Sequence, residues 1–244
     1  MNFICKQCGT VIEAEQIPCS CQACGSGKLV EDPEELRKRK EAERRAAAKP
    51  LFDLLDGGLV KLKDKDKYVA KTPVTQALWR LVMGENPSAF IGDENPVEHV
   101  SWSDCRNFLD KLNSREEVKE FGLRFALPTK DEWEEFHAND KVLLSDPKGK
   151  GAKSDVFIGN IAWYWENSER TTHRVAEKNP DPFGLYDVYG NVMEWLDSEG
   201  PKGMKLCAGG CWCSSAAACT GTECFAPTER RSYIGFRVVA YKVS

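Results

Sequence analysis

Four cysteines near the N-terminus have the type and spacing of a tetrahedral metal site. Cys5 and Cys8 form one C-x2-C-G pair, and Cys21 and Cys24 form a second pair after twelve intervening residues. Zinc prefers four thiolates in such an arrangement, and the glycine after each pair permits a tight turn. Because so short a segment buries little core, metal binding would supply its folding energy. The pattern predicts structural zinc bound within residues 1–30, with redox-active or adventitious thiols as the alternatives.

Residues 1–30 resemble a zinc ribbon, and this resemblance implies a surface that binds a protein partner or stabilises the chain.

A second group of cysteines lies in residues 211–233, which we call the cassette. Its four cysteines stand among Ser, Ala, Thr and Gly residues, which bury little apolar area each. The flanks, Gly209-Gly210 with Trp212 on one side and Ile234–Val239 on the other, have the aromatic and β-branched residues typical of strands. A segment of this composition between two strands is expected to be a displayed surface. Its residues alone leave open whether that surface catalyses a reaction or only binds.

Length, charge and cysteine content narrow the class of protein. The 244 residues, 41% hydrophobic and 30% charged, suit one sizeable soluble domain with a small appendage. A net charge of −4 provides no electrostatic argument for nucleic acid, and no apolar run is long enough to cross a membrane. The N-terminus lacks the pattern of a secretory signal. The eleven cysteines therefore favour metal binding and free thiols in the cytoplasm, with neither nucleic acid nor membrane as a partner.

The chain between these two cysteine groups must position them. Residues 31–50 combine strong helix formers with mixed charges, which predicts a charged helical linker. The main domain is expected over residues 51–244, with three helices that begin at the N-caps Thr75, Ser101 and Thr129. Compact helices followed by long irregular loops and late strands indicate an α+β fold.

Six stretches of the main domain carry a family resemblance. In chain order they read PVTQALWRLVMGENPSAF, NPVEHVSWSDC, LRFALPTKDEWE, NIAWYWENS, PFGLYDVYGNVMEW, and a closing GG-x-W … IGFRVV. Taken together they resemble the formylglycine-generating enzyme (sulfatase-modifying factor) family over about residues 60–240. The resemblance implies an elaborated C-type lectin fold, and it says much less about activity.

The resemblance also implies a calcium site. Asp187 and Glu194 flank a glycine turn, and a hard cation such as calcium binds carboxylates together with turn carbonyls. The positions that match the family's calcium ligands are Asp187, Glu194 and the carbonyls of Gly190 and Val192. The alternative is that the two carboxylates simply cap turns by accepting backbone hydrogen bonds.

An oxidase function would need a pair of thiols. Active members of the family bind copper with two cysteines in a C-x4-C arrangement that begins four residues after the glycine pair. Here Cys219 matches the second cysteine, whereas Ser214 stands in the place of the first. Cys213 comes one residue early, and on a strand that shift directs a side chain to the opposite face. A copper-dependent oxidase with Cys219 and Cys213 as catalytic residues is therefore the alternative, and an inert partner-recruiting scaffold is a further one.

A binding function suits the cassette better. The cassette and its closing strand are similar to the variable proteins of diversity-generating retroelements, in which adenines of selected codons are mutated. Only Trp212, Glu223 and Glu229 of the cassette lie outside the residue types that such codons reach. We therefore expect a non-enzymatic protein that binds a protein or another macromolecule. The predicted ligand contacts are Cys211, Cys213, Ser214, Ser215, Cys219, Thr220, Thr222, Phe225, Arg231, Ser232 and Tyr233.

Overall fold

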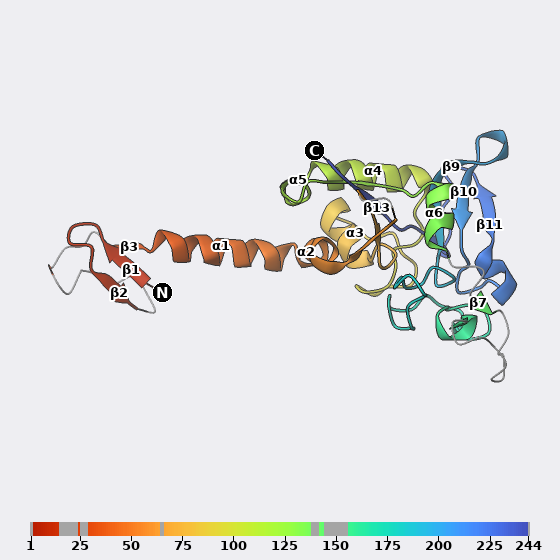
Figure 1. The fold of residues 1–244 in the computed structure, drawn as a ribbon, viewed down its shortest axis with the longest axis horizontal. Helices are drawn as coiled ribbons and strands as arrows, with labels where there is room; N and C mark the ends of the chain where they lie inside the picture. Colours follow the sequence, from red (N-terminus) through yellow and green to blue (C-terminus); the bar gives the residue numbers. More distant parts are fainter. Residues whose placement is uncertain are drawn as a thin grey trace. The chain divides into compact units, whose positions relative to one another are not determined.

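The computed structural model describes residues 2–14, 24, 29–63, 66–137, 142–143 and 156–243. The chain divides into two compact units, Met1–Phe52 and Asp53–Ser244 (Figure 1).

The N-terminal unit contains a small antiparallel sheet with the strand order β2-β1-β3. The strands are β1 (Asn2–Cys5), β2 (Val11–Glu13) and β3 (Leu29–Glu31). Phe3 and Cys5 are both buried, because alternate residues of a strand point to the same side. After β1 the chain turns at Gly9, which adopts a left-handed conformation with φ of 75°.

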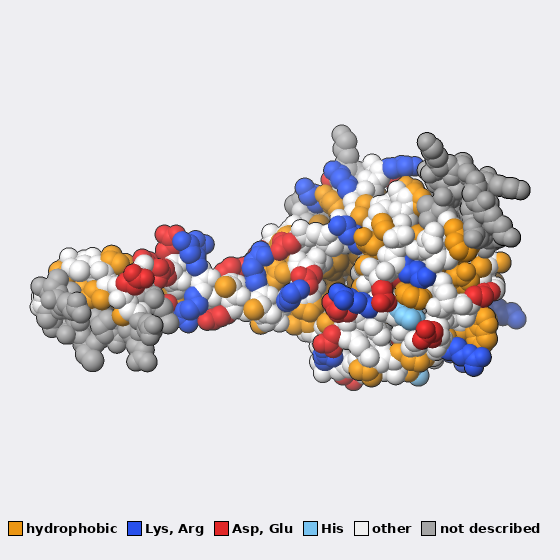
Figure 2. Space-filling model, turned by 90° about the horizontal axis from the view of Figure 1, so that it is seen from below, with side chains coloured by type: hydrophobic (Ala, Val, Ile, Leu, Met, Phe, Trp, Pro, Cys, Tyr) orange, Lys and Arg blue, Asp and Glu red, His pale blue; other side chains and the backbone are white. Residues whose placement is uncertain are grey.

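Helix α1 (Pro33–Ala47) follows this sheet and covers most of the stretch that the sequence assigns to a linker. Asp32 caps it by accepting a hydrogen bond from the Glu34 backbone, and Pro33 occupies the first turn, where no backbone donor is needed. Its side chains are exposed or half-buried, and acidic and basic residues are interspersed along it (Figure 2). Pairs such as Lys38 with Glu34, 2.8 Å apart, are exposed to solvent, so each contributes little to stability.

Three helices of the larger unit begin where the sequence predicts. They are α3 (Gln76–Met83), α4 (Trp102–Ser114) and α6 (Lys130–Phe136). The hydroxyl of Thr75 accepts a hydrogen bond from the third helical residue, and Ser101 and Thr129 each form a capping box with an acidic residue three positions later. The three N-cap predictions are confirmed.

The larger unit also contains shorter elements. These are α2 (Lys49–Gly57, which begins in the N-terminal unit), α5 (Glu116–Glu120), the parallel pair β7 (Val142–Leu143) and β8 (Val156–Phe157), and the 3-10 turns η2 (Ile158–Asn160), η3 (Pro201–Gly203) and η4 (Ala216–Thr220).

Two four-stranded sheets organise the larger unit. The first is antiparallel, with the order β4-β5-β13-β6, and consists of β4 (Leu59–Lys61), β5 (Lys67–Ala70), β13 (Val239–Lys242) and β6 (Leu123–Ala126). The second has the order β11-β10-β9-β12 and consists of β11 (Thr222–Phe225), β10 (Lys205–Ala208), β9 (Met193–Glu199) and β12 (Ile234–Gly235). Strands β9, β10 and β11 lie side by side, and α6 packs against β9 and β10 (Figure 1).

The strand predicted over Ile234–Val239 is not continuous. Residues 234–235 form β12, which is parallel to β9, whereas β13 begins at Val239 and belongs to the other sheet. Phe236 and Arg237 lie between the two strands and are fully buried. The segment before the cassette also differs from the prediction, since β10 ends at Ala208 and Gly209 adopts a left-handed conformation with φ of 74°.

The core joins elements that are distant in the sequence. Trp79 of α3 stacks on Phe108 of α4 with ring centroids 5.2 Å apart, and Phe236 meets both rings edge-on. Because Phe236 follows β12, this aromatic group ties the helices to the residues that follow the cassette. A second buried cluster includes Trp133, Tyr164, Tyr189 and Cys219.

Candidate functional site

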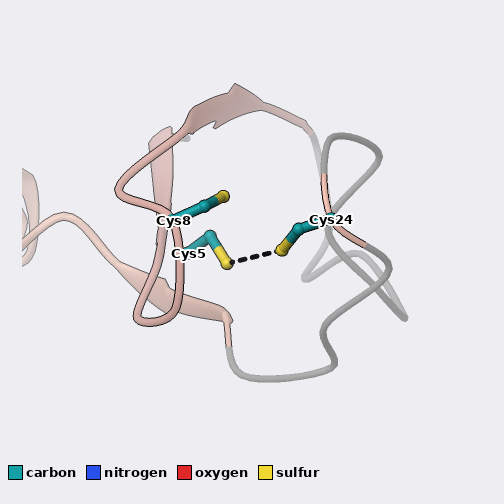
Figure 3. Close-up of side chains that lie close together, drawn as sticks. All are labelled: Cys5, Cys8 and Cys24. Carbon is teal, nitrogen blue, oxygen red and sulfur yellow. Dashed lines mark hydrogen bonds between the residues drawn. The ribbon is translucent and has the colours of Figure 1, made fainter.

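Three cysteines of the N-terminal unit converge (Figure 3). The sulfurs of Cys5, Cys8 and Cys24 all lie within 4.8 Å of one another, with Cys5 Sγ 3.6 Å from Cys24 Sγ. This is the one cluster with metal-ligand geometry that a search of the described residues found. Cys21, the predicted fourth ligand, lies outside the described residues.

The surroundings of these thiols favour their ionised forms. The hydroxyl of Thr10 lies 3.1 Å from Cys8 Sγ, and this hydrogen bond is the main cause that lowers the pKa of Cys8 to about 6. The backbone N–H of Cys8 in turn lowers the pKa of Cys5. Because thiolates are the form that binds metal ions, the donor set fits a metal ion that prefers sulfur.

The cassette begins in a tight turn after β10. The N–H of Ser214 donates to the Cys211 carbonyl over 3.0 Å, and the N–H of Trp165 donates to the Ser214 carbonyl over 2.9 Å. Ser215 then caps η4 through the N–H of Ala218, and the chain continues into β11. These contacts fix the backbone of the first half of the cassette against the loop that contains Trp165.

Most of the predicted contact residues are accessible. Those that are exposed or half-buried are Cys213, Ser214, Ser215, Thr220, Thr222, Phe225, Arg231, Ser232 and Tyr233. Arg231 pairs with Glu229 in the same loop. Phe225 and Tyr233 lie edge to face, with ring centroids 6.4 Å apart.

Two predicted contact residues lie inside the domain instead. Cys211 has an exposed fraction of 2% and Cys219 of 0%, so neither sulfur belongs to the displayed surface. Cys219 is part of the buried cluster that contains Tyr164 and Tyr189. The small polar residues around these thiols predict a surface position. Cysteine is compatible with both the surface and the core, and only packing decides between them.

Trp212 connects the cassette to neighbouring segments of the domain. Its indole N–H donates to the Ser232 carbonyl over 3.0 Å, which joins the two ends of the cassette. Its ring meets Phe90 edge-on at 5.4 Å, and Ser168 donates to its carbonyl over 2.6 Å. These contacts make Trp212 a framework residue.

The thiols do not form the pair that a copper oxidase would need. Burial raises the pKa of Cys219 to about 12. The position that holds the other cysteine of the pair in the family is occupied here by Ser214. The sulfur of Cys213 instead lies 3.3 Å from Cys211 Sγ. The thiol pair that converges thus has C-x-C spacing, and the C-x4-C pair of the family is absent because Ser214 stands in its first position.

A cleft of about 350 Å³ adjoins the cassette. Thr220, Gly221 and Thr222 line one side, and Lys130, Trp133, Glu134 and His137 line the other. His137 stacks on Trp133 with centroids 4.0 Å apart, and burial lowers its pKa to about 4, so the ring is neutral near pH 7. No local pattern of residues indicates a binding role for α6, because α6 and the cassette are far apart in the sequence and meet only in the folded chain.

The predicted calcium ligands are occupied by protein groups. Both carboxylate oxygens of Glu194 accept hydrogen bonds from Arg237, over 2.8–3.1 Å. Asp187 accepts from the Ala176 backbone over 2.9 Å and from Asn191 over 3.4 Å, and the Gly190 carbonyl accepts from the N–H of Val192. A guanidinium in contact with Glu194 repels a cation, so this set does not fit calcium.

Among the described residues, no helix has both the length and the apolar composition needed to cross a membrane. On the face of the larger unit shown in Figure 2, acidic and basic side chains are mixed.

Comparison with known proteins places this geometry in a family. Residues 37–242 match the model of the sulfatase-modifying factor enzyme 1-like domain. The chain is 27% identical over 206 residues to the chaperone protein LppX of Paenibacillus barcinonensis, covering 62% of this chain and 70% of the relative. It is 30% identical over 155 residues to the inactive C-alpha-formylglycine-generating enzyme 2 of Bos taurus, covering 59% of this chain but only 47% of that protein.

A solved structure is similar over most of its length. Treponema denticola variable protein 1 superposes with a TM-score of 0.58 and 26% identity, covering 76% of this chain and 91% of that one. This likeness agrees with the mixed helices and paired sheets of the larger unit, which has an α+β, C-type lectin-like fold. The chain thus belongs to the family of sulfatase-modifying factor enzyme 1-like domains.

Proposed function

We propose that this chain is a non-enzymatic ligand-binding protein that displays the cassette on a C-type lectin-like scaffold, as the variable protein of a diversity-generating retroelement. One observation carries the proposal. The residues on either side of the cassette, 207–210 and 234–240, are buried, whereas all cassette side chains except Cys211 and Cys219 are exposed or half-buried. Side chains at the accessible positions can therefore vary without disturbing the core.

The scaffold provides what such a surface requires. Trp212, Ser168 and Trp165 fix the cassette backbone through the hydrogen bonds described above, so its side chains are held in place before a ligand binds. Phe225 and Tyr233 offer large contact areas with little loss of rotamer entropy, and Ser and Thr hydroxyls offer adaptable hydrogen bonds. The cleft beside Thr220 and Thr222 adds a concave region. These features suit a protein or another macromolecule as the ligand.

The similar proteins support this direction. One is a variable protein of solved structure, and another is named as an inactive member of the formylglycine-generating enzymes. The burial of Cys219 and the Ser214 in place of its partner count against a copper-dependent oxidase. We further propose that Cys5, Cys8 and Cys24 bind structural zinc together with Cys21, in the cytoplasm, where thiols remain reduced. In this proposal the resulting ribbon offers a surface to a protein partner.

Sequencing tests the proposal most directly. We would sequence the locus from many cells of one population and compare the codons of the cassette with those of the flanks. We expect differences concentrated at residues 211–233, with a near-copy of that segment and a reverse transcriptase gene close by. Identical cassettes in all cells would refute the assignment to a diversity-generating retroelement.

A stability comparison tests the scaffold independently. We expect Thr222→Ala, on the exposed surface, to change the free energy of unfolding by less than about 0.5 kcal/mol. Ile234→Ala, which empties a buried framework position, should cost about 2–5 kcal/mol. Urea unfolding measures both, and equal losses would mean that the cassette is part of the core.

An activity assay tests the oxidase alternative. The full chain, loaded with copper, is incubated with a cysteine-containing sulfatase peptide, and aldehyde is measured. We expect no aldehyde above the level of a Cys219→Ser variant. Aldehyde formation that this variant abolishes would overturn the non-enzymatic proposal.

A further inference from the structure

The turn that opens the cassette holds two thiols side by side. Cys211 Sγ lies 3.3 Å from Cys213 Sγ, and the turn is closed by the hydrogen bond from the Ser214 N–H to the Cys211 carbonyl. The two sulfurs are thus neighbours within a closed turn, although Trp212 separates the two cysteines in the chain.

Ser214 makes the two thiols unequal. Its Oγ accepts a hydrogen bond from the Cys211 N–H over 3.1 Å, which leaves its own hydrogen to donate to Cys211 Sγ, also 3.1 Å away. Cys211 Sγ thus lies within hydrogen-bond distance of both the Ser214 hydroxyl and the Cys213 sulfur. The hydrogen bond between the two sulfurs lowers the pKa of Cys211 to about 7 and raises the pKa of Cys213, so Cys211 is the thiol that ionises first.

Exposure separates their roles further. Cys211 is 2% exposed, whereas Cys213 is half-buried and has access to solvent. A small molecule therefore reaches Cys213 first, and Cys211 is a buried nucleophile next to it.

We propose that Cys211 and Cys213 form a dithiol oxidation site that reacts with small-molecule disulfides and closes to an intramolecular disulfide. In the first step Cys213 gives up its proton to solvent, its sulfur attacks the small disulfide RS–SR, and RS⁻ leaves and takes up a proton from solvent. In the second step Cys211 is the nucleophile. The Cys211 thiolate then attacks Cys213 Sγ, forms the Cys211–Cys213 bond and expels the second RS⁻, which solvent protonates. The protein loses two electrons, and the reagent gains them as two thiols.

Formation of the disulfide requires only the two neighbouring sulfurs of this turn. A consequence for ligand binding, namely that the surface around Cys213 differs between the reduced and oxidised states, rests on the proposed function of the cassette. The experiment below reads the disulfide itself, so its failure would leave the proposed function intact.

The test uses the full chain in buffers that span a range of ratios of reduced to oxidised glutathione. Free thiols are alkylated at equilibrium, and chymotrypsin then cleaves after Trp212, between the two cysteines. A Cys211–Cys213 disulfide is seen by mass spectrometry as two fragments that remain joined. We expect the joined fragments to replace the doubly alkylated form as the fraction of oxidised glutathione rises, and to separate again on reduction.

Variants assign the bond to these two sulfurs. Cys213→Ser should abolish the joined fragments, and Cys211→Ser should accumulate glutathione on Cys213 because no second thiol resolves the mixed disulfide. Cys224→Ser, at a half-buried cysteine elsewhere in the cassette, is the matched control and should behave as the unmodified chain. Two alkylated thiols at every ratio, or persistent glutathione on Cys213 in the unmodified chain, would overturn the proposal.

Discussion

Cys219 lies directly against the backbone of Gly210. A Cβ placed on Gly210 would come within 2.7 Å of the Cys219 Cα and even closer to its sulfur. Gly210 ends the buried segment before the cassette, and Cys219 belongs to η4, so the contact joins the entrance of the cassette to its middle. The Cys219 side chain is fully buried at this contact.

Gly210→Ala should therefore destabilise the domain. The added methyl overpacks the contact with Cys219, and overpacking typically costs about 1–3 kcal/mol. Gly221→Ala is the matched control, since its Cβ would lie at an ordinary distance of 3.5 Å from the Ala218 carbonyl. Urea unfolding of both variants measures the difference, and an equal effect at the two glycines would contradict the packing described here.

Arg237→Met should be among the most disruptive single changes. It leaves the buried Glu194 carboxylate without its ion-pair partner and removes the donors to the Ala70 and Tyr186 carbonyls. Breaking a buried pair from one side costs about 3–5 kcal/mol, whereas replacing both members with apolar residues costs less. We expect Arg237→Met with Glu194→Met to recover part of the loss in a thermal or urea unfolding experiment.

Calcium should not stabilise the protein at this site. Because the Arg237 guanidinium already holds both oxygens of Glu194, we expect millimolar calcium to leave the midpoint of thermal unfolding unchanged. Magnesium at the same ionic strength is the control. If calcium but not magnesium raised the midpoint, and Asp187→Asn abolished this rise, the calcium ligands that the family resemblance implies would be correct.

Zinc content should depend on the N-terminal thiols. We expect the purified chain to contain ~1 zinc ion, as four-coordinate thiolate sites do, and Cys8→Ser to lose most of it. Cys224→Ser, in the larger unit, should retain it. Metal analysis after exhaustive dialysis measures all three proteins, and an unchanged zinc content in Cys8→Ser would remove Cys8 from the ligand set.

The pH dependence of stability should carry a signature of Glu98. This carboxyl is fully buried, accepts a hydrogen bond from the Phe90 N–H over 2.8 Å, and its Oε2 has no hydrogen-bond partner among the described residues. Burial raises the pKa of Glu98 from 4.5 to about 7. The folded state thus prefers the protonated form, so its contribution to stability is complete below the unfolded pKa and is lost as the pH rises toward and past 7.

Glu98→Gln isolates this effect. The amide keeps an oxygen to accept from Phe90 but does not ionise, so the variant should lose less stability than the unmodified chain between pH 4.5 and 8. The difference is at most about 3.5 kcal/mol, since the pKa rises from 4.5 to about 7 and one unit of pKa corresponds to about 1.4 kcal/mol. Parallel stability curves for the two proteins across this range would contradict the raised pKa.

Local features were decided by the sequence itself. The helices α3, α4 and α6 begin at Thr75, Ser101 and Thr129 because an N-cap needs only a side-chain oxygen and a backbone donor two or three residues later. The C-x2-C spacing of Cys5 and Cys8 likewise brings two sulfurs together through one turn. The cassette was recognisable from its small polar residues and its flanks. Such signals lie within a few residues of one another, so they can be read without knowledge of the fold.

Only the tertiary structure decided which of these residues face solvent. Cys211 and Cys219 are buried, Ile234–Val239 divides between two sheets, and Arg237 between those strands reaches Glu194, 43 residues earlier in the chain. The cleft between α6 and the cassette arises in the same way. Each of these features depends on contacts between segments that are distant in sequence. Burial and the pairing of charges are properties of the packed chain, and therefore no local pattern of residues predicts them.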